Sequence, residues 1–286
     1  MSYYPEQRTR RRRRSGFSGW KIRLMISGAI VLFSAVSYYS SGTPNPITGE
    51  DQRVGGMTIE QEIELGRNAA YGMVQQHGGL SANERARKVV EMVGKRLENS
   101  LQLQMRKQGR QLPYPFDFHL LADQRVVNAF ALPGGQVFIT EALFARMTEE
   151  GQLAGVLGHE IGHVIERHGA ERMASGQFFQ RVGAAAGVAG GDVSSARMAG
   201  AALKMLSSKY SRAAELESDR RGIELMVWTG YDPGHLLQVM DILAESSGGG
   251  APPEFMSSHP KPENRKEYIA QVINETFPNG LPPGLR

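Results

Sequence analysis

Residues 153–168, LAGVLGHEIGHVIERH, decide the fold of this chain. Their apolar positions recur three and four residues apart, which is the spacing of a helix with a buried face: Leu153, Val156, Leu157, Ile161, Val164 and Ile165. Thr148 is a candidate N-cap ahead of this stretch, and Gly169 is placed where a helix can end. We therefore predict one continuous helix through His168.

Within this helix lies the motif HEIGH, residues 159–163. Histidines four positions apart project from the same side of a helix, so both imidazoles can bind one tetrahedral metal ion. Glu160 points away from the pair and can reach a water on that metal, where a general base is needed. A chance pair of helical histidines is the alternative, but it would rarely fall on so regular a helix. The motif predicts a metal site with His159 and His163 as ligands.

A catalytic zinc needs a third protein ligand and one open position for water. The segment ELESD, residues 215–219, lies on a second predicted helix over 211–229. Glu215 and Asp219 are four positions apart on one face, so one can bind the metal while the other accepts a hydrogen bond from a ligand histidine. An ordinary acidic helix surface is the alternative interpretation.

The N-terminal region predicts a membrane anchor. Residues 1–23 carry a net charge of +7, which leaves −3 for the remainder of the chain. Residues 22–39 are apolar apart from Arg23, and as a helix they span about 27 Å, close to the hydrocarbon thickness of a bilayer. A basic cluster stays in the cytoplasm, so everything after residue 40 is expected on the other side, facing the periplasm of a bacterial inner membrane. A cleaved signal peptide, with residues 35–37 as its cleavage site, is the alternative.

The remaining pattern indicates one mainly helical α+β domain. Helices are expected at 60–76, 84–107, 232–245 and 262–274, strands at 116–121, 126–132 and 136–140, and an Ala/Gly-rich pair of segments at 176–207 broken at 190–191. Close packing through small residues is the favoured interpretation of that pair, with membrane contact as the alternative. We divide the chain into a basic tail (1–21), a transmembrane helix (22–40), a juxtamembrane linker (41–56) and a catalytic domain (57–286).

Composition narrows the functional classes. The chain has no cysteine, which excludes disulfides and thiolate metal ligands. Because the basic charge is confined to the N-terminus, the high pI gives no argument for nucleic-acid binding, and none is expected. The sequence predicts no oligomeric state.

Five segments together resemble one family: HEIGH (159–163), ELESD (215–219), NPITG (45–49), NAFALPGGQVFIT (128–140) and SSHP (257–260). The combination resembles the zincin-like HExxH zinc metallopeptidases related to HtpX, the CAAX prenyl proteases and the mitochondrial Oma-type proteases. The resemblance extends over about residues 45–270. The chain has a single clear transmembrane segment, so it looks closer to the periplasmic and Oma-type branch, which argues against prenylated substrates.

The resemblance implies the role of each site residue. His159, His163 and Glu215 would bind one Zn²⁺ per chain, Glu160 would be the general base, and Asp219 would orient a ligand. Residues 128–140 would be a substrate-side hairpin on which Asn128, Ala129, Phe130 and Ala131 pair with an extended peptide; a plain hairpin is the alternative.

His259 is a further catalytic candidate, as a donor to the developing oxyanion. Occupation of the open zinc position and a purely structural role are its two alternatives. Four other histidines have no comparable context, and we interpret them as structural or surface residues: His77, His119, His168 and His235.

We therefore expect a membrane-anchored zinc endopeptidase that cleaves proteins. The resemblance implies protein quality control, with misfolded or membrane and envelope proteins as substrates. A proteolytically inactive, chaperone-like binding module of the same fold is the main alternative, but it should have lost at least one of the motif residues. A zinc hydrolase of non-peptide amides is a third possibility, which the strand hairpin disfavours.

Overall fold

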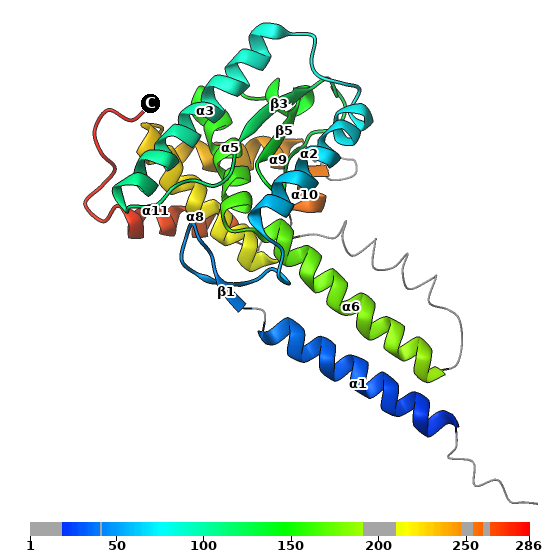
Figure 1. The fold of residues 1–286 in the computed structure, drawn as a ribbon. Coiled ribbons are helices and arrows are strands. Elements are labelled where there is room, and N and C mark those ends of the chain that lie inside the picture. Colours follow the sequence, from blue (N-terminus) through cyan, green and yellow to red (C-terminus); the bar gives the residue numbers. More distant parts are fainter. Residues whose placement is uncertain (1–18, 41, 191–209, 247–253, 260–263) are drawn as a thin grey trace, which may run out of the picture.

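The computed structural model describes residues 19–40, 42–190, 210–246, 254–259 and 264–286. Helices surround a small sheet, as Figure 1 shows. The elements, in chain order, are α1 (Gly19–Ser40), β1 (Gly42–Pro44), β2 (Asp51–Arg53), α2 (Ile59–Gln76), α3 (Glu84–Lys107), β3 (Asp117–Leu121), β4 (Ala129–Leu132), β5 (Gln136–Thr140), α4 (Glu141–Phe144), α5 (Glu150–Ile165), α6 (His168–Gly190), α8 (Arg212–Thr229), α9 (Gly234–Glu245), α10 (Glu254–Ser258) and α11 (Arg265–Thr276). The predicted class, mainly helical with a small sheet, is confirmed.

The three-stranded sheet has the order β3-β5-β4. Strands β3 and β5 are parallel, with Asp117 opposite Gln136, and β4 runs antiparallel to β5. The β4–β5 hairpin is the one expected from the sequence. Its turn contains Gly134 at φ 82°, and a Cβ there would lie 2.4 Å from the Cα of Ile63 in α2. Glycine is therefore required at this turn, and β4 is left as an edge strand of the sheet.

Helix α5 is the centre of the domain. Each residue from Gly151 to Ile165 is buried, because α3, α8, α9 and β4 pack around it. Its closest neighbour is α8. A Cβ on Gly162 would lie 2.9 Å from the Cα of Ser218, and one on Gly222 would lie 3.1 Å from the backbone nitrogen of His159. Glycine inside a helix costs about 1 kcal/mol relative to alanine, and here it permits the close helix contact that brings the two halves of the site together.

The expected helix through His168 is wrong at its end. Helix α5 stops at Ile165, Arg167 adopts a left-handed φ of 57°, and a new helix, α6, begins at His168. Arg167 donates hydrogen bonds to Glu62 (Nε to Oε1, 2.7 Å) and to the carbonyl of Met57 (2.6 Å). These contacts stabilise the turn. Their partners lie in α2 and in the segment just before it, about a hundred residues earlier, so no local sequence pattern predicted them.

The segment between α1 and α2 packs against the end of α5. The side-chain amide of Asn45 donates to the carbonyl of Ile165 (2.7 Å), and its Oδ1 accepts from the backbone nitrogen of Ile47 (2.8 Å). Thr48 donates to Glu166 over 3.2 Å. The NPITG segment thus satisfies one of the free carbonyls at the C-terminal end of α5.

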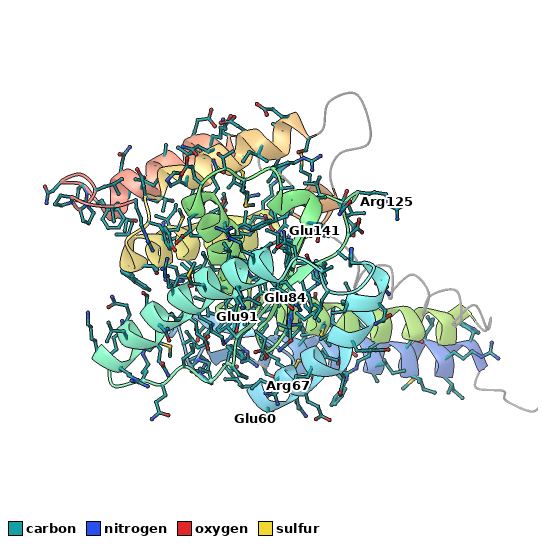
Figure 2. The ribbon with its side chains drawn as sticks, turned by 90° about the horizontal axis from the view of Figure 1, so that it is seen from above. Glu60, Arg67, Glu84, Glu91, Arg125 and Glu141 are labelled. Atoms are coloured by element: carbon teal, nitrogen blue, oxygen red, sulfur yellow. The ribbon has the colours of Figure 1, made fainter. Side chains whose placement is uncertain are left out.

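Two helices extend beyond the domain. Helix α1 is long and apolar enough to cross a bilayer, and most of its large apolar side chains are exposed. Helix α6 packs along it, and both point away from the domain in Figure 1. The domain itself has an ordinary charged surface: Figure 2 shows Glu60 and Arg67 on α2 and Glu84 and Glu91 on α3, all of which are exposed. The second half of the predicted pair at 176–207, which follows the break at 190–191, lies outside the described residues.

Candidate metal centre

Helices α5 and α8 bring three predicted ligands to one point. His159 and His163 face the same way from α5, with their Nε2 atoms 3.1 Å apart. Glu215, in the first turn of α8, places Oε1 3.4 Å from His163 Nε2 and Oε2 3.6 Å from His159 Nε2. All three side chains are buried, with at most 2% of each exposed.

The donor set fits a zinc ion. A tetrahedral Zn²⁺ with ligands at about 2.0–2.1 Å holds them roughly 3.3 Å from one another, and the three separations here lie between 3.1 and 3.6 Å. Burial lowers the pKa of His163 well below its ordinary value, so its imidazole is neutral and able to bind a metal. Burial alone would raise the pKa of Glu215, but hydrogen bonds from His163 and His259 outweigh burial and lower it, so this carboxylate is ionised.

Asp219 and Arg265 fix His159. Asp219 lies one turn after Glu215 and accepts a hydrogen bond from His159 Nδ1 (2.9 Å), which directs Nε2 toward the cluster. Arg265, at the start of α11, donates hydrogen bonds to both carboxylate oxygens of Asp219 (2.8 and 2.7 Å). Its guanidinium also lies 3.2 Å from Glu215 Oε2. Burial raises the pKa of Asp219, but the Arg265 guanidinium and the hydrogen bond from His159 together outweigh burial, so the pKa is lowered.

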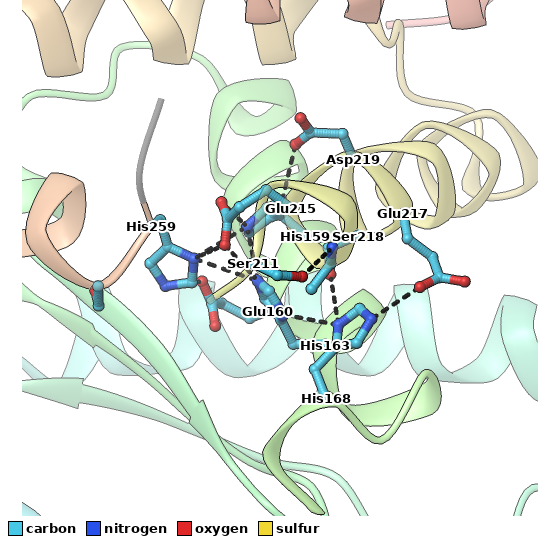
Figure 3. Close-up of polar contacts among 12 residues, drawn as sticks. His159, Glu160, His163, His168, Ser211, Glu215, Glu217, Ser218, Asp219 and His259 are labelled. Carbon is cyan, nitrogen blue, oxygen red and sulfur yellow. Dashed lines mark hydrogen bonds and ion pairs between the residues drawn. The ribbon is translucent and has the colours of Figure 1, made fainter. Parts of the chain in front are cut away.

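His168 and Glu217 fix His163. His163 Nδ1 is 3.0 Å from His168 Nδ1, and His168 Nε2 is 2.9 Å from Glu217 Oε2 (Figure 3). A carboxylate only accepts hydrogen bonds. His168, when neutral, therefore donates from Nε2 and accepts at Nδ1, which leaves His163 to donate from its own Nδ1. In that tautomer the Nε2 of His163 has a free lone pair facing the cluster.

Glu160 differs from every other carboxylate around the cluster. It is fully buried, yet neither of its oxygens has a hydrogen-bond partner among the described residues. Burial raises its pKa above the ordinary value. A buried carboxylate that accepts no hydrogen bond is costly, and such groups are typical of sites where chemistry requires them. Together, Glu160, Glu215 and Asp219 supply three negative charges against one positive charge on Arg265, a surplus that suits a divalent cation.

His259 comes from the C-terminal end of α10 and completes the group. Its Nδ1 lies 3.0 Å from Glu215 Oε1, 3.2 Å from His163 Nε2 and 3.3 Å from His159 Nε2. These four ligand atoms lie within 4.8 Å of one another. The Nδ1 of His259 is therefore at the fourth corner of the cluster, while its Nε2 faces Glu160 Oε1 at 3.6 Å.

The predicted substrate strand lies beside the cluster. Strand β4 packs against α5, and a small recess is lined by Ala131, Leu132, His163 and Tyr210. The rings of Tyr210 and His163 are stacked with centroids 3.9 Å apart. Asn128 sits just before β4 and accepts two hydrogen bonds from Thr140 through its carbonyl. Of the predicted strand residues, 129–131 lie in β4 itself.

A second group of carboxylates has a different character. Glu50, Glu166 and Glu217 also lie within 4.8 Å of one another. Arg221 enters this group and pairs with Glu166 (2.5 Å) and Glu50 (3.0 Å). Because the guanidinium of Arg221 pairs with these carboxylates, the group is an ion-pair network. The metal site is therefore assigned to the histidine cluster.

Three residues that contact the proposed ligands were not predicted from the sequence. Arg265 follows His259 by six positions, but its partners are on α8, 46 to 50 residues away. His168 was interpreted as structural or surface, and its Nδ1 contacts a proposed ligand. Tyr210 precedes the helix of Glu215 and stacks on His163. The spacing of five residues between His163 and His168 could have indicated their contact. The contacts of Arg265 and Tyr210 could be found only from the tertiary structure.

A buried His-His-Glu cluster on two helices, beside an unpartnered glutamate, is the arrangement of a metallopeptidase. Comparison with known proteins agrees: residues 91–273, more than half of the chain, match Peptidase family M48. The chain therefore belongs to Peptidase family M48. This confirms the predicted enzyme class and the resemblance to membrane-associated HExxH metallopeptidases.

Relatives share this region. The chain is 33% identical to the beta-barrel assembly-enhancing protease of Escherichia coli (strain K12) over 192 residues, 63% of this chain and 39% of that protein. It is 30% identical to the mitochondrial metalloendopeptidase OMA1 of Arabidopsis thaliana over 153 residues, 54% of this chain and 31% of that protein. With the mitochondrial metalloendopeptidase OMA1 of Schizosaccharomyces pombe it shares 31% over 163 residues, 56% and 47% of the two chains. The chain thus spans less than half the length of each.

Proposed function

We propose that this chain is a zinc-dependent endopeptidase that is anchored in a membrane and cleaves proteins. The observation that carries the proposal is the buried group of His159, His163 and Glu215, whose ligand atoms are spaced for one tetrahedral ion, next to the unpartnered Glu160. The family supports peptide bonds as the target. The relatives that share this region are a protease and a metalloendopeptidase.

Each part of the site has its own role in the proposed reaction. Zinc, when bound, would activate a water and polarise the scissile carbonyl. Glu160 accepts the proton of the attacking water and passes it to the leaving amine. Its raised pKa brings the carboxyl closer to working pH, which suits a group that must take up and release a proton. An extended substrate pairs with the free edge of β4.

Two of the three roles considered for His259 place it at the metal, and of these the geometry supports occupation of the open zinc position better than oxyanion stabilisation. An oxyanion donor needs to stand apart from the ligand set, whereas the Nδ1 of His259 lies 3.0–3.3 Å from all three proposed ligands. We therefore propose that His259 occupies the fourth position at rest and leaves it when substrate enters.

Helix α1 supports the anchoring. It is the helix long and apolar enough to cross a bilayer among the described residues, and the basic cluster before it favours retention of the N-terminus in the cytoplasm. The catalytic domain would then lie on the other side, in a bacterial periplasm. Misfolded or envelope proteins are the substrates that this location favours.

The activity is tested with purified full-length protein and an unfolded protein substrate. We expect fragments that disappear with a chelator and return with Zn²⁺, and one zinc per chain by metal analysis. His159→Ala and Glu215→Ala should lose the metal, whereas Glu91→Gln, on the exposed face of α3, should keep both metal and activity. Cleavage that persists in chelator, or full zinc content in either ligand variant, would contradict the site.

The orientation is tested by reporters fused after residue 56. A reporter that functions only after export should be active, and a reporter that functions only in the cytoplasm should be silent. The reverse result would refute the proposed topology.

The role of His259 is tested by His259→Ala on the same substrate. If His259 occupies the fourth position, its removal should raise the rate of cleavage at unchanged zinc content. If it is the oxyanion donor, kcat should fall by up to roughly 10² to 10³-fold with little change in KM. The sign of the effect decides between the two roles. His235→Ala, on α9, is the matched control.

A further inference from the structure

Helices α1 and α6 form one antiparallel pair. Figures 1 and 2 both show them side by side, extending away from the domain. Near the domain, the rings of Tyr38 and Phe178 are stacked with centroids 5.1 Å apart. Farther along α1, Ser27 and Ser34 are its two buried residues, seven positions apart and hence on one face. Small residues at such a face permit close helix packing in a membrane.

The burial of Ser27 shows how far the pairing extends. Ser27 precedes Tyr38 by eleven residues, which is about 16 Å of helix. Helix α6 packs along this length of α1. The opposite side of α1 carries exposed large apolar side chains, among them Leu32 at 66% and Phe33 at 72%. Lipid that surrounds these side chains would also lie beside the length of α6 that packs on α1.

We propose that α6 enters the bilayer beside α1, so that the membrane-embedded part of the protein is a helix pair. The sequence of α6 is compatible with this position: residues 182–190, VGAAAGVAG, carry no charge. Its nearest charge is the exposed Arg181, three residues past Phe178 and thus about 5 Å along the helix. A long arginine side chain at that depth can reach the interface.

The insertion fixes the height of the candidate metal centre above the membrane. Helix α6 begins at His168, whose Nδ1 is 3.0 Å from His163 Nδ1. Ten residues separate His168 from Phe178, which is about 15 Å of helix. The cluster therefore lies on the order of 15 Å from the level of Tyr38 and Phe178. On the proposed peptidase function, the peptide bonds within reach are those presented close to the bilayer surface.

The test uses the full chain in vesicles of phosphatidylethanolamine and phosphatidylglycerol. Because the chain has no cysteine, a cysteine placed at each of residues 182–189 in turn can be labelled uniquely with an environment-sensitive fluorophore. Two matched controls are exposed leucines: Leu32→Cys on α1 and Leu103→Cys on α3, which are 66% and 54% exposed. Quenching by lipids with a nitroxide on the acyl chain is compared with quenching by iodide in the water.

We expect positions on one side of α6 to be quenched by the nitroxide lipids as strongly as position 32, and position 103 to respond only to iodide. If all eight positions behave as position 103 does, α6 lies outside the bilayer and the proposal is wrong. Failure of position 32 to meet the lipid would also overturn it. Circular dichroism checks that each variant is folded, and because neither cleavage nor zinc binding is measured, failure of the peptidase proposal would remain a separate result.

Discussion

Two buried charged clusters lie near the turn between α5 and α6, and they differ in how completely their charged groups are paired. In the first, Arg167 donates to Glu62, and Tyr114 donates to the other oxygen of Glu62 over 2.9 Å. All three residues are at most 5% exposed. Burial raises the pKa of the Tyr114 hydroxyl, which keeps it a donor. This cluster balances one negative charge with one positive charge.

The second cluster, around His159 and His163, is buried to the same degree but is left incomplete. Glu160 has no hydrogen-bond partner among the described residues, and the carboxylates outnumber the guanidinium. In a fully paired buried cluster each charge is compensated, whereas an unpaired buried charge costs stability and is retained where chemistry needs it. The comparison therefore separates a structural cluster from a candidate site by pairing, since burial alone does not distinguish them.

The largest expected effect comes from Glu160→Gln. The amide has nearly the same shape as the carboxylate, so zinc content should not change. It cannot accept the proton of the attacking water, so kcat should fall by roughly 10² to 10⁴-fold. Zinc analysis together with turnover of an unfolded protein measures both. If Glu160→Gln kept full, chelator-sensitive turnover, another residue would be the general base. The unpaired Glu160 would then no longer distinguish a catalytic cluster from a structural one.

Glu62→Ala should act on stability instead. Removal of one partner of a buried pair leaves Arg167 without its carboxylate, which costs about 3–5 kcal/mol of unfolding free energy. Denaturant unfolding measures the loss. Glu64→Ala, an exposed neighbour on α2, should be close to neutral. Equal stabilities of the two variants would show that the Glu62–Arg167 pair does not hold the turn at residue 167.

Asp219→Asn tests the orientation of a ligand. Asparagine cannot provide a carboxylate to both His159 and Arg265, so zinc affinity should weaken by about 10–100-fold. Competition with a chromophoric chelator gives the dissociation constant. Asp241→Asn, on the exposed face of α9, is the control. An unchanged affinity would mean that His159 is held by its packing alone.

The smallest expected effect is that of Asn45→Ala. This change removes the hydrogen bond to the carbonyl of Ile165 and the internal bond to Ile47. The loss should be about 1 kcal/mol, the typical net contribution of a hydrogen bond. Thermal unfolding measures it against Asn68→Ala on the exposed side of α2. No difference between the two would show that the NPITG segment does not stabilise the end of α5.

Local sequence patterns determined much of this protein. The period of α5 predicted a buried helix, the four-residue spacings predicted which side chains share a face, and the apolar run at residues 22–39 predicted α1. The β4–β5 hairpin was readable because Pro133, Gly134 and Gly135 mark its turn. Each of these depends on neighbours within one or two helical turns, so the pattern contains the physical cause.

Tertiary structure alone decided the rest. The end of α5 depends on Arg167 reaching Glu62, which is 105 residues away. Three contacts of the candidate site join side chains from separate elements. Arg265 donates to Asp219, His259 lies beside Glu215, and Tyr210 stacks on His163. The pairing of α1 with α6 is equally non-local. A sequence specifies which groups can interact, but such partners meet only after the chain has folded, because their contacts depend on packing and on desolvation rather than on spacing along the chain.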